Sequence, residues 1–191
     1  MSFIPILLYH SVSDHPAEWI APFTLSPRAF EAQMDAIAEA GASTLTVSEL
    51  VDALRHEPVN LPRRPVLVTF DDGFADFRQA ALDTMAERGI RSTLYVTTGY
   101  ANTATGPRGE RMLDWSGLAE LDAHGVELGG HTHTHPQLDT LTRARASHEI
   151  GQCKALLEER LGKPVRSFAY PHGYSGPAVR HLVRAASGVP R

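Results

Sequence analysis

The stretch VLVTFDDG at residues 66–73 places an apolar run directly before two adjacent carboxylates and a glycine. The run predicts a buried strand of the kind found in parallel sheets. Polar residues that follow such a strand lie at the carboxyl edge of the sheet, where parallel α/β folds build their sites. The stretch therefore predicts both the fold class and the place of the chemistry.

Outward from this strand, short apolar runs alternate with longer amphipathic ones. The helix-like runs begin at capping residues, such as Ser26 before Pro27 and the capping-box pair Thr46 and Glu49, and most of them end at a glycine. Repeated helix, glycine and strand are typical of βα units, so we expect an α/β fold with a mostly parallel sheet. The expected strands are Ile4–Tyr9, Ser43–Leu45, Val66–Phe70, Ser92–Thr97, Val126–Leu128 and Val165–Tyr170, and further helices are expected at Asp76–Arg88, Ser116–His124, Thr142–Leu161 and Gly176–Ser187.

No repeat, low-complexity tract or linker divides the chain, which predicts one domain over residues 1–191. Two long connections, Ser11–Leu25 and Thr98–Leu113, are of a length that is usually functional or mobile in a compact domain. After the last expected helix, with Gly188 as its C-cap, the pattern calls for one or two more strands. We therefore expect a sheet with an open edge, or a shortened form of a longer domain. An open edge predicts pairing with a second copy.

The composition excludes several classes of protein. Hydrophobic residues make up 42% and charged residues 21%, as in an ordinary globular domain, and the net charge of −4 comes without the basic stripe of a nucleic-acid binder. No apolar stretch is long enough to span a membrane, and the single Cys153 excludes an internal disulfide framework. The N-terminus lacks the pattern of a secretory leader, so the sequence favours the cytoplasm.

Histidines and carboxylates follow several of the expected strands. Asp71 and Asp72 come after residues 66–70, three histidines come after 126–130, and His10 and His172 follow two further apolar runs. Because the carboxyl ends of parallel strands share one edge of a sheet, we expect these side chains to lie close together. His10 alone is a weak signal, since a single histidine after a strand is more often structural.

The three histidines at 131, 133 and 135 allow two geometries. In a helix or tight turn His131 and His135 converge while His133 points away, whereas in a strand all three share a face. One carboxylate with two imidazoles is a common set of ligands for a divalent metal. The alternative is a surface His-Thr repeat, and Asp71-Asp72-Gly73 by itself is often only a turn.

Four segments together resemble the NodB-type polysaccharide deacetylases, carbohydrate esterase family 4. TFDDG at 69–73 is similar to the first motif of that family, HTHTHP at 131–136 to the second, FAYPHG at 168–173 to the third, and MLDW at 112–115 to the fourth. The resemblance implies a distorted, incomplete (β/α) barrel. It also implies one divalent metal ion, zinc by default, with cobalt, nickel or iron also suited to the ligands.

The resemblance assigns roles by position. Asp71 would be the general base, and the metal ligands would be Asp72, His131 and His135. His133 carries no family role. The substrate side would be formed by Trp115, Tyr170, Pro171 and His172. Trp115 would line the acetyl pocket, and His172 would offer its backbone N–H to the oxyanion.

Two departures point to one branch of the family. Ala169 stands where the third motif usually carries an arginine, and the usual C-terminal Leu-x-Ile-His motif is absent, while Leu7-Leu8-Tyr9-His10 near the N-terminus is similar to it. Both features resemble the circularly permuted branch that deacetylates poly-β-1,6-N-acetylglucosamine. His10 would then be the general acid.

The sequence thus predicts metal-dependent N-deacetylation of an amino-sugar glycan, with a carbohydrate as partner. An O-acetyl esterase or another metal-dependent amidase would use the same centre. A catalytically impaired carbohydrate-binding module is the alternative outside enzymes. A two-metal nuclease or phosphatase would need more carboxylates and basic residues than these segments supply. The family mostly works outside the cell membrane, which is at odds with the absent leader.

Overall fold

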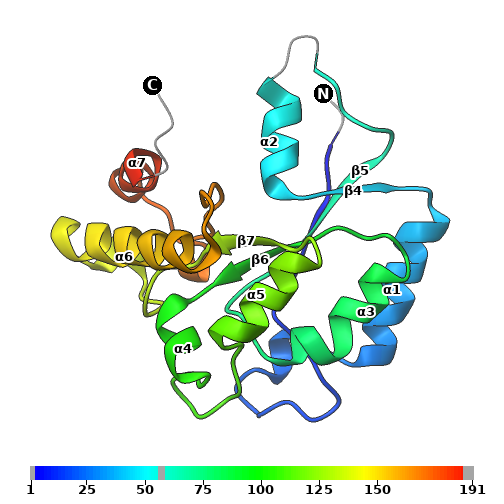
Figure 1. The fold of residues 1–191 in the computed structure, drawn as a ribbon, viewed down its shortest axis with the longest axis horizontal. Helices are drawn as coiled ribbons and strands as arrows, with labels where there is room; N and C mark the ends of the chain where they lie inside the picture. Colours follow the sequence, from blue (N-terminus) through cyan, green and yellow to red (C-terminus); the bar gives the residue numbers. More distant parts are fainter. Residues whose placement is uncertain (1–2, 56–58, 187–191) are drawn as a thin grey trace.

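Strand β5 (Pro65–Phe70) is the centre of the sheet in this computed structural model, which describes residues 3–55 and 59–186 (Figure 1). It pairs in parallel with β1 (Ile6–Tyr9), β4 (Ser43–Leu45) and β6 (Thr93–Val96), and β6 pairs in parallel with β7 (Glu127–Gly130). Leu67 is in register with Ile6 and also with Leu45, so β4 lies on the opposite side of β5 from β1. The predicted α/β fold with a mostly parallel sheet is confirmed.

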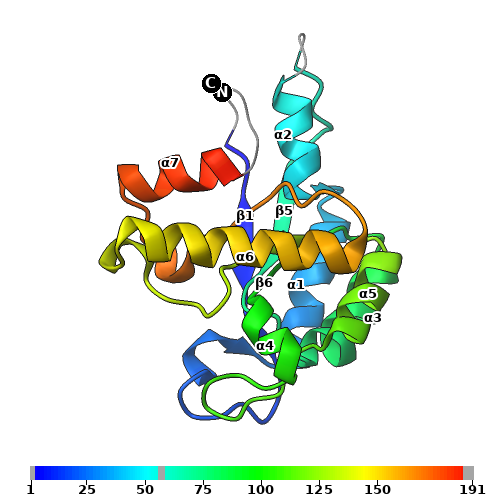
Figure 2. The same cartoon turned by 60° about the vertical axis from the view of Figure 1, so that its left-hand side comes forward.

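Helices cover this sheet and frame its edges (Figures 1 and 2). A second, two-stranded ladder joins β2 (Ser11–Val12) to β3 (Thr24–Leu25) inside the first long connection. Helix α7 lies against α6 in both views. The helices are α1 (Pro27–Glu39), α2 (Val47–Arg55), α3 (Leu82–Ala86), α4 (Thr98–Thr103), α5 (Trp115–Ala123), α6 (Arg143–Leu161) and α7 (Pro177–Ala186).

The predicted helix ends are present as hydrogen bonds. Ser26 Oγ accepts from the backbone N–H of Ala29 at the start of α1. At α2, the side chains of Thr46 and Glu49 each accept from the other's backbone N–H. Gly162 ends α6 at φ +66°, a left-handed conformation that glycine adopts without strain. Local sequence therefore determines where these helices begin and end.

An aromatic cluster fills the space between the sheet and helix α1. Phe70, at the end of β5, has its ring centroid 5.2 Å from Tyr9, 5.8 Å from Phe30 and 4.6 Å from Phe77. All four side chains are buried. This packing holds the carboxyl end of β5, and with it the two residues that follow, in a fixed position.

The expected strand Val165–Tyr170 is wrong, because only Phe168 forms a bridge, to Gly130 of β7. The backbone of Val165 bonds instead to side chains of α6: its N–H donates to Glu158, and its carbonyl accepts from Lys154. At the other end Pro171 has no N–H to extend a ladder. The segment contacts β7 through two backbone hydrogen bonds at Gly130 and through Ser167 Oγ, which donates to Glu127, but it forms no ladder.

Two other expectations need correction. The connection Thr98–Leu113 is not a loop throughout, since α4 occupies its first third, anchored by hydrogen bonds from the N–H groups of Thr98 and Gly99 to the backbone at 132–133. The helix expected at Asp76–Arg88 begins as a π-helical turn, Phe77–Ala81, before α3. Insertions of this kind are common near functional sites.

Strand β1 has a free edge in the part of the chain that the structure describes, because β5 is its only strand partner there. Ile6 and Leu8 on this strand are 61% and 55% exposed. Within residues 59–186 no strand follows β7, and Gly188, the expected C-cap of α7, lies outside the described residues. Barrel closure is therefore not seen.

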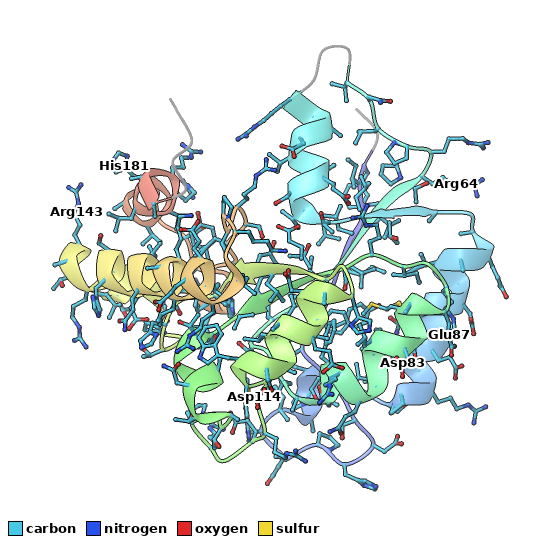
Figure 3. The ribbon with its side chains drawn as sticks, in the orientation of Figure 1. Arg64, Asp83, Glu87, Asp114, Arg143 and His181 are labelled. Atoms are coloured by element: carbon cyan, nitrogen blue, oxygen red, sulfur yellow. The ribbon has the colours of Figure 1, made fainter. Side chains whose placement is uncertain are left out.

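Charged side chains project outward from many elements rather than gathering in one place (Figure 3). Arg64, Asp83, Glu87 and Arg143 are exposed, and so is His181 on α7. Among the described helices, none is long and apolar enough to cross a membrane.

Candidate metal centre

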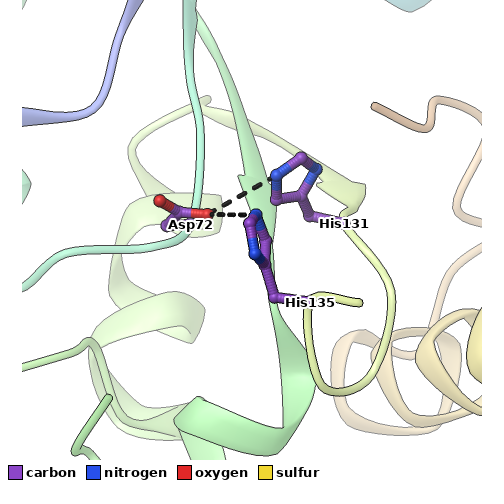
Figure 4. Close-up of side chains that lie close together, drawn as sticks. All are labelled: Asp72, His131 and His135. Carbon is purple, nitrogen blue, oxygen red and sulfur yellow. Dashed lines mark ion pairs between the residues drawn. The ribbon is translucent and has the colours of Figure 1, made fainter. Parts of the chain in front are cut away.

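Three side chains from two sheet ends meet at the carboxyl edge of the sheet (Figure 4). Asp72 follows β5, and His131 follows β7, with His135 four residues further on. Asp72 Oδ1 lies 3.1 Å from His135 Nε2 and 3.5 Å from His131 Nε2. The ligand atoms of the three residues lie within 4.8 Å of one another. The structure thus brings together the set that the sequence singled out.

A tight turn decides between the two geometries of the histidine segment. Thr132 and His135 have φ of +68° and +60°, and Thr132 Oγ1 accepts from the N–H of His135 at 3.0 Å. His131 and His135 consequently converge, with ring centroids 4.9 Å apart. His133 faces away and its Nδ1 lies 3.0 Å from Thr98 Oγ1.

Glu149 on α6 holds this turn from outside, and no motif or spacing pointed to this residue. Its Oε2 accepts from the backbone N–H groups of His133 (2.9 Å) and Thr134 (2.8 Å), and its Oε1 accepts from Thr134 Oγ1 (2.8 Å). One carboxylate therefore compensates two N–H groups in a turn that contains unfavourable backbone angles.

Helix α4 closes on the other side of the turn. The N–H of Gly99 donates to the carbonyl of His133 at 2.7 Å. A Cβ atom at position 99 would lie 2.5 Å from that carbonyl oxygen, so only glycine permits this approach.

The donor set fits a divalent cation. His131 Nδ1 lies 3.0 Å from the carbonyl of Ala169, which can only accept, so Nδ1 carries the hydrogen and Nε2 presents its lone pair toward Asp72. Within the described part of the chain, the buried Oδ1 of Asp72 has no hydrogen-bond donor. One carboxylate oxygen and two imidazole nitrogens with such orientation are a set that zinc-type ions accept.

The pKa values of the two adjacent carboxylates are shifted in opposite directions. Burial, reinforced by the charge of Asp72, raises the pKa of Asp71 to about 7. Burial also acts to raise the pKa of Asp72, but the adjacent imidazoles of His135 and His131 lower it overall. Burial lowers the pKa of His131 to about 4, so this ring is neutral at pH 7. Asp72 is thus the ionised member of the pair.

His10 lies at the same edge. It follows β1, and its half-buried ring has its centroid 5.3 Å from that of Phe23. Burial lowers its pKa, while the charge of Asp72 acts to raise it. The next residue, Ser11, donates a 2.5 Å hydrogen bond to Asp76 Oδ2, which anchors the backbone just after His10.

Only part of the third motif, FAYPHG at 168–173, lies beside the ligand cluster. The backbone carbonyl of Ala169 orients His131, and the ring of His172 lies 4.7 Å from that of His135, with His172 itself in a left-handed conformation at φ +59°. Pro171 is buried, and Tyr170 packs on Phe168 in a separate apolar cluster beside α7.

A cavity of about 200 Å³ opens onto the ligand cluster. Its lining includes Asp72, His135 and His172 but not Trp115. Nε1 of Trp115 donates to Asn102 at 2.8 Å, and the guanidinium carbon of Arg160 lies 5.5 Å from the centroid of its ring. The tryptophan that lines the cavity is Trp19, from the long connection after β1. The unusual length of that connection was the only sequence signal for it.

Comparison with known proteins defines the class. The polysaccharide deacetylase family model matches residues 59–187, so the chain belongs to the polysaccharide deacetylase family. The family resemblance seen in the motifs is confirmed.

Particular relatives refine the match. YxkH of Bacillus subtilis, assigned to the polysaccharide deacetylases, is 27% identical over 173 residues, which cover 89% of this chain but only 57% of that protein. A chitin deacetylase of Colletotrichum lindemuthianum is 32% identical over 99 residues, 48% of this chain and 38% of that protein. The chain thus spans little more than half the length of YxkH.

Solved structures extend the similarity to the N-terminus. The deacetylase PplD of Streptococcus pyogenes matches with a TM-score of 0.85 at 25% identity, and IcaB of Ammonifex degensii with 0.83 at 27%. Each match covers 96% of this chain and 80% of the other. A family 4 carbohydrate esterase of Streptomyces lividans shares the fold over 64% of this chain and 58% of its own, with a TM-score of 0.55 at 23% identity. The fuller match to PplD and IcaB agrees with the resemblance to the permuted branch.

Proposed function

We propose that this chain is a metal-dependent hydrolase that removes N-acetyl groups from an N-acetylglucosamine-containing glycan. The observation that carries the proposal is the convergence of Asp72, His131 and His135 beside a second carboxylate, Asp71, in a chain of this family. The three converging residues would hold one divalent ion, with zinc the first choice for this donor set. An ion there would polarise the acetamide carbonyl and make a water molecule more acidic.

The roles of the chain's own residues follow from their positions. Asp71 accepts the proton of the attacking water, because it is adjacent to the cluster and its Oδ1 has no hydrogen-bond donor among the described residues. His10 donates a proton to the departing amine, which leaves poorly as an anion. The ring of His172 lies beside that of His135, and the backbone N–H of His172 would donate to the developing oxyanion.

We also propose a surface through which two copies of the chain associate. The free edge of β1, with Ile6 and Leu8 exposed on it, is suited to pairing with a second copy of the chain. An edge-to-edge homodimer would bury this strand without blocking the catalytic edge, which lies at the carboxyl ends of the strands.

Acetate release tests the function. The protein is incubated with β-1,4- and β-1,6-linked N-acetylglucosamine tetramers, and free acetate and bound metal are measured on the same sample. We expect release that stops on chelation and returns with added zinc. Asp71→Asn should keep the metal and lose the rate by orders of magnitude. Absence of release from both tetramers by metal-loaded protein would contradict the proposal.

A further inference from the structure

Trp19 is an aromatic side chain that lines the cavity opening onto the ligand cluster. It stands in the connection between β2 and β3 and is half-buried. The guanidinium carbon of Arg108 lies 4.9 Å from its ring centroid, and the ring of Phe74 lies 6.2 Å away on a tilt of 40°. Trp19 and Arg108 come from the two long connections, which therefore meet at this point.

The pair borders the cavity that reaches the cluster. The same space of about 200 Å³ is lined by Trp19 and Arg108 and by Asp72 and His135 of the ligand cluster. Phe74 and Met112, both buried, and Tyr100 also belong to its lining. A molecule that extends from the ligand cluster into this cavity would contact these side chains.

The chemistry of the lining suits an N-acylated sugar. Phe74, Met112 and Trp19 offer an apolar surface for the acyl methyl group and the C–H face of a pyranose ring. Glu110, which also lines the cavity, accepts from the backbone N–H of Arg108 at 3.0 Å. The guanidinium of Arg108 forms no ion pair among the described residues and lies over the Trp19 ring, so its N–H donors are available to sugar hydroxyls. Arg108 is also exposed at the mouth of the cavity.

We infer that Trp19, together with Arg108, is the specificity-determining element that recognises the N-acylated hexosamine next to the ligand cluster. The inference rests on the proposed function and names the residues that select its substrate. Trp115, whose Nε1 donates to Asn102, does not line this cavity.

The chain has two tryptophans, which makes fluorescence a direct test. Trp115→Phe leaves only Trp19 as reporter, and Trp19→Phe leaves only Trp115. Each chelated variant is titrated with the N-acetylglucosamine tetramers and, as a control for the acyl group, with a glucosamine tetramer. Equal unfolding midpoints of the variants confirm that both remain folded.

We expect a saturable emission change in Trp115→Phe with the N-acetylated tetramers and none in Trp19→Phe. Arg108→Gln, made in the Trp115→Phe background, should raise the dissociation constant at least several-fold, whereas Arg143→Gln on the outer face of α6 should not. An emission change carried by Trp115, no change in Trp115→Phe, or equal response to the glucosamine tetramer would overturn the inference.

Kinetics separate this inference from the function itself. If acetate is released normally and Trp19→Ala leaves KM unchanged, the assignment of Trp19 fails and the function stands. If Trp19 binds the tetramer selectively but no acetate is released, the enzyme assignment fails and recognition by Trp19 stands.

Discussion

At the scale of single residues, the three histidines of one short segment have different surroundings. The Nε2 atoms of His131 and His135 face Asp72, whereas His133 faces Thr98. We expect His131→Ala and His135→Ala each to weaken ion binding by more than roughly 100-fold, beyond the 10–100-fold typical of outer-shell changes. His133→Ala should retain the ion. The metal content of each variant and its affinity by titration calorimetry test this prediction. If His133→Ala were the one variant of the three to lose the ion, the ligand assignment would be wrong.

His10 and Asp71 define the expected pH dependence. His10 must be protonated to donate, so activity falls as pH rises through its pKa, which burial lowers. Asp71 must be ionised to accept, so activity falls as pH drops through its pKa, which burial raises to about 7 in the metal-free protein and which a cation at Asp72 would lower. The profile of kcat/KM should therefore be bell-shaped.

The variant His10→Ala should still bind the metal, and its rate should be lower by roughly 10²–10⁴-fold, as expected when a proton transfer is lost. The alkaline limb of the profile should disappear with it. A variant with near-normal amide hydrolysis and an unchanged alkaline limb would remove His10 from the mechanism.

At the scale of elements, helix α6 controls the histidine turn through Glu149. Gln at this position keeps the shape but loses the charge that strengthens three hydrogen bonds. We expect Glu149→Gln to weaken metal binding about tenfold and the free energy of unfolding to fall by about 1–3 kcal/mol.

Glu159→Gln, exposed on the same helix, is the matched control and should change neither quantity. Calorimetry of metal binding and urea denaturation measure the two effects. Unchanged metal affinity in Glu149→Gln would mean that the turn keeps its conformation without this carboxylate.

At the scale of the whole molecule, the free edge of β1 is the feature with a consequence for assembly. We expect a concentration-dependent dimer by light scattering, and Leu8→Lys, which places a charge on this exposed strand, should shift it to monomer. Leu54→Lys, at a 48% exposed position on α2, serves as control. A protein that stays monomeric at all concentrations, or a Leu8→Lys variant that stays dimeric, would refute the edge pairing.

Local patterns in the sequence were sufficient for the strand–helix alternation and for the caps at Ser26 and Thr46, and the resemblance to the family motifs named Asp72, His131 and His135. A buried strand brings the next residue to the sheet edge, and a cap bonds to a group three residues away, so both depend on neighbours that are close in the chain. Such relations are visible in a linear chain.

Only the tertiary structure decided the rest. Trp19 rather than Trp115 lines the cavity because two distant connections meet there. Glu149 reaches the histidine turn from α6, a helix that begins eight residues after His135. Val165–Tyr170 has the composition of a strand, but side chains of α6 occupy the backbone groups at its start. These outcomes depend on which surfaces pack together across long separations, and no spacing or propensity within a segment encodes that competition.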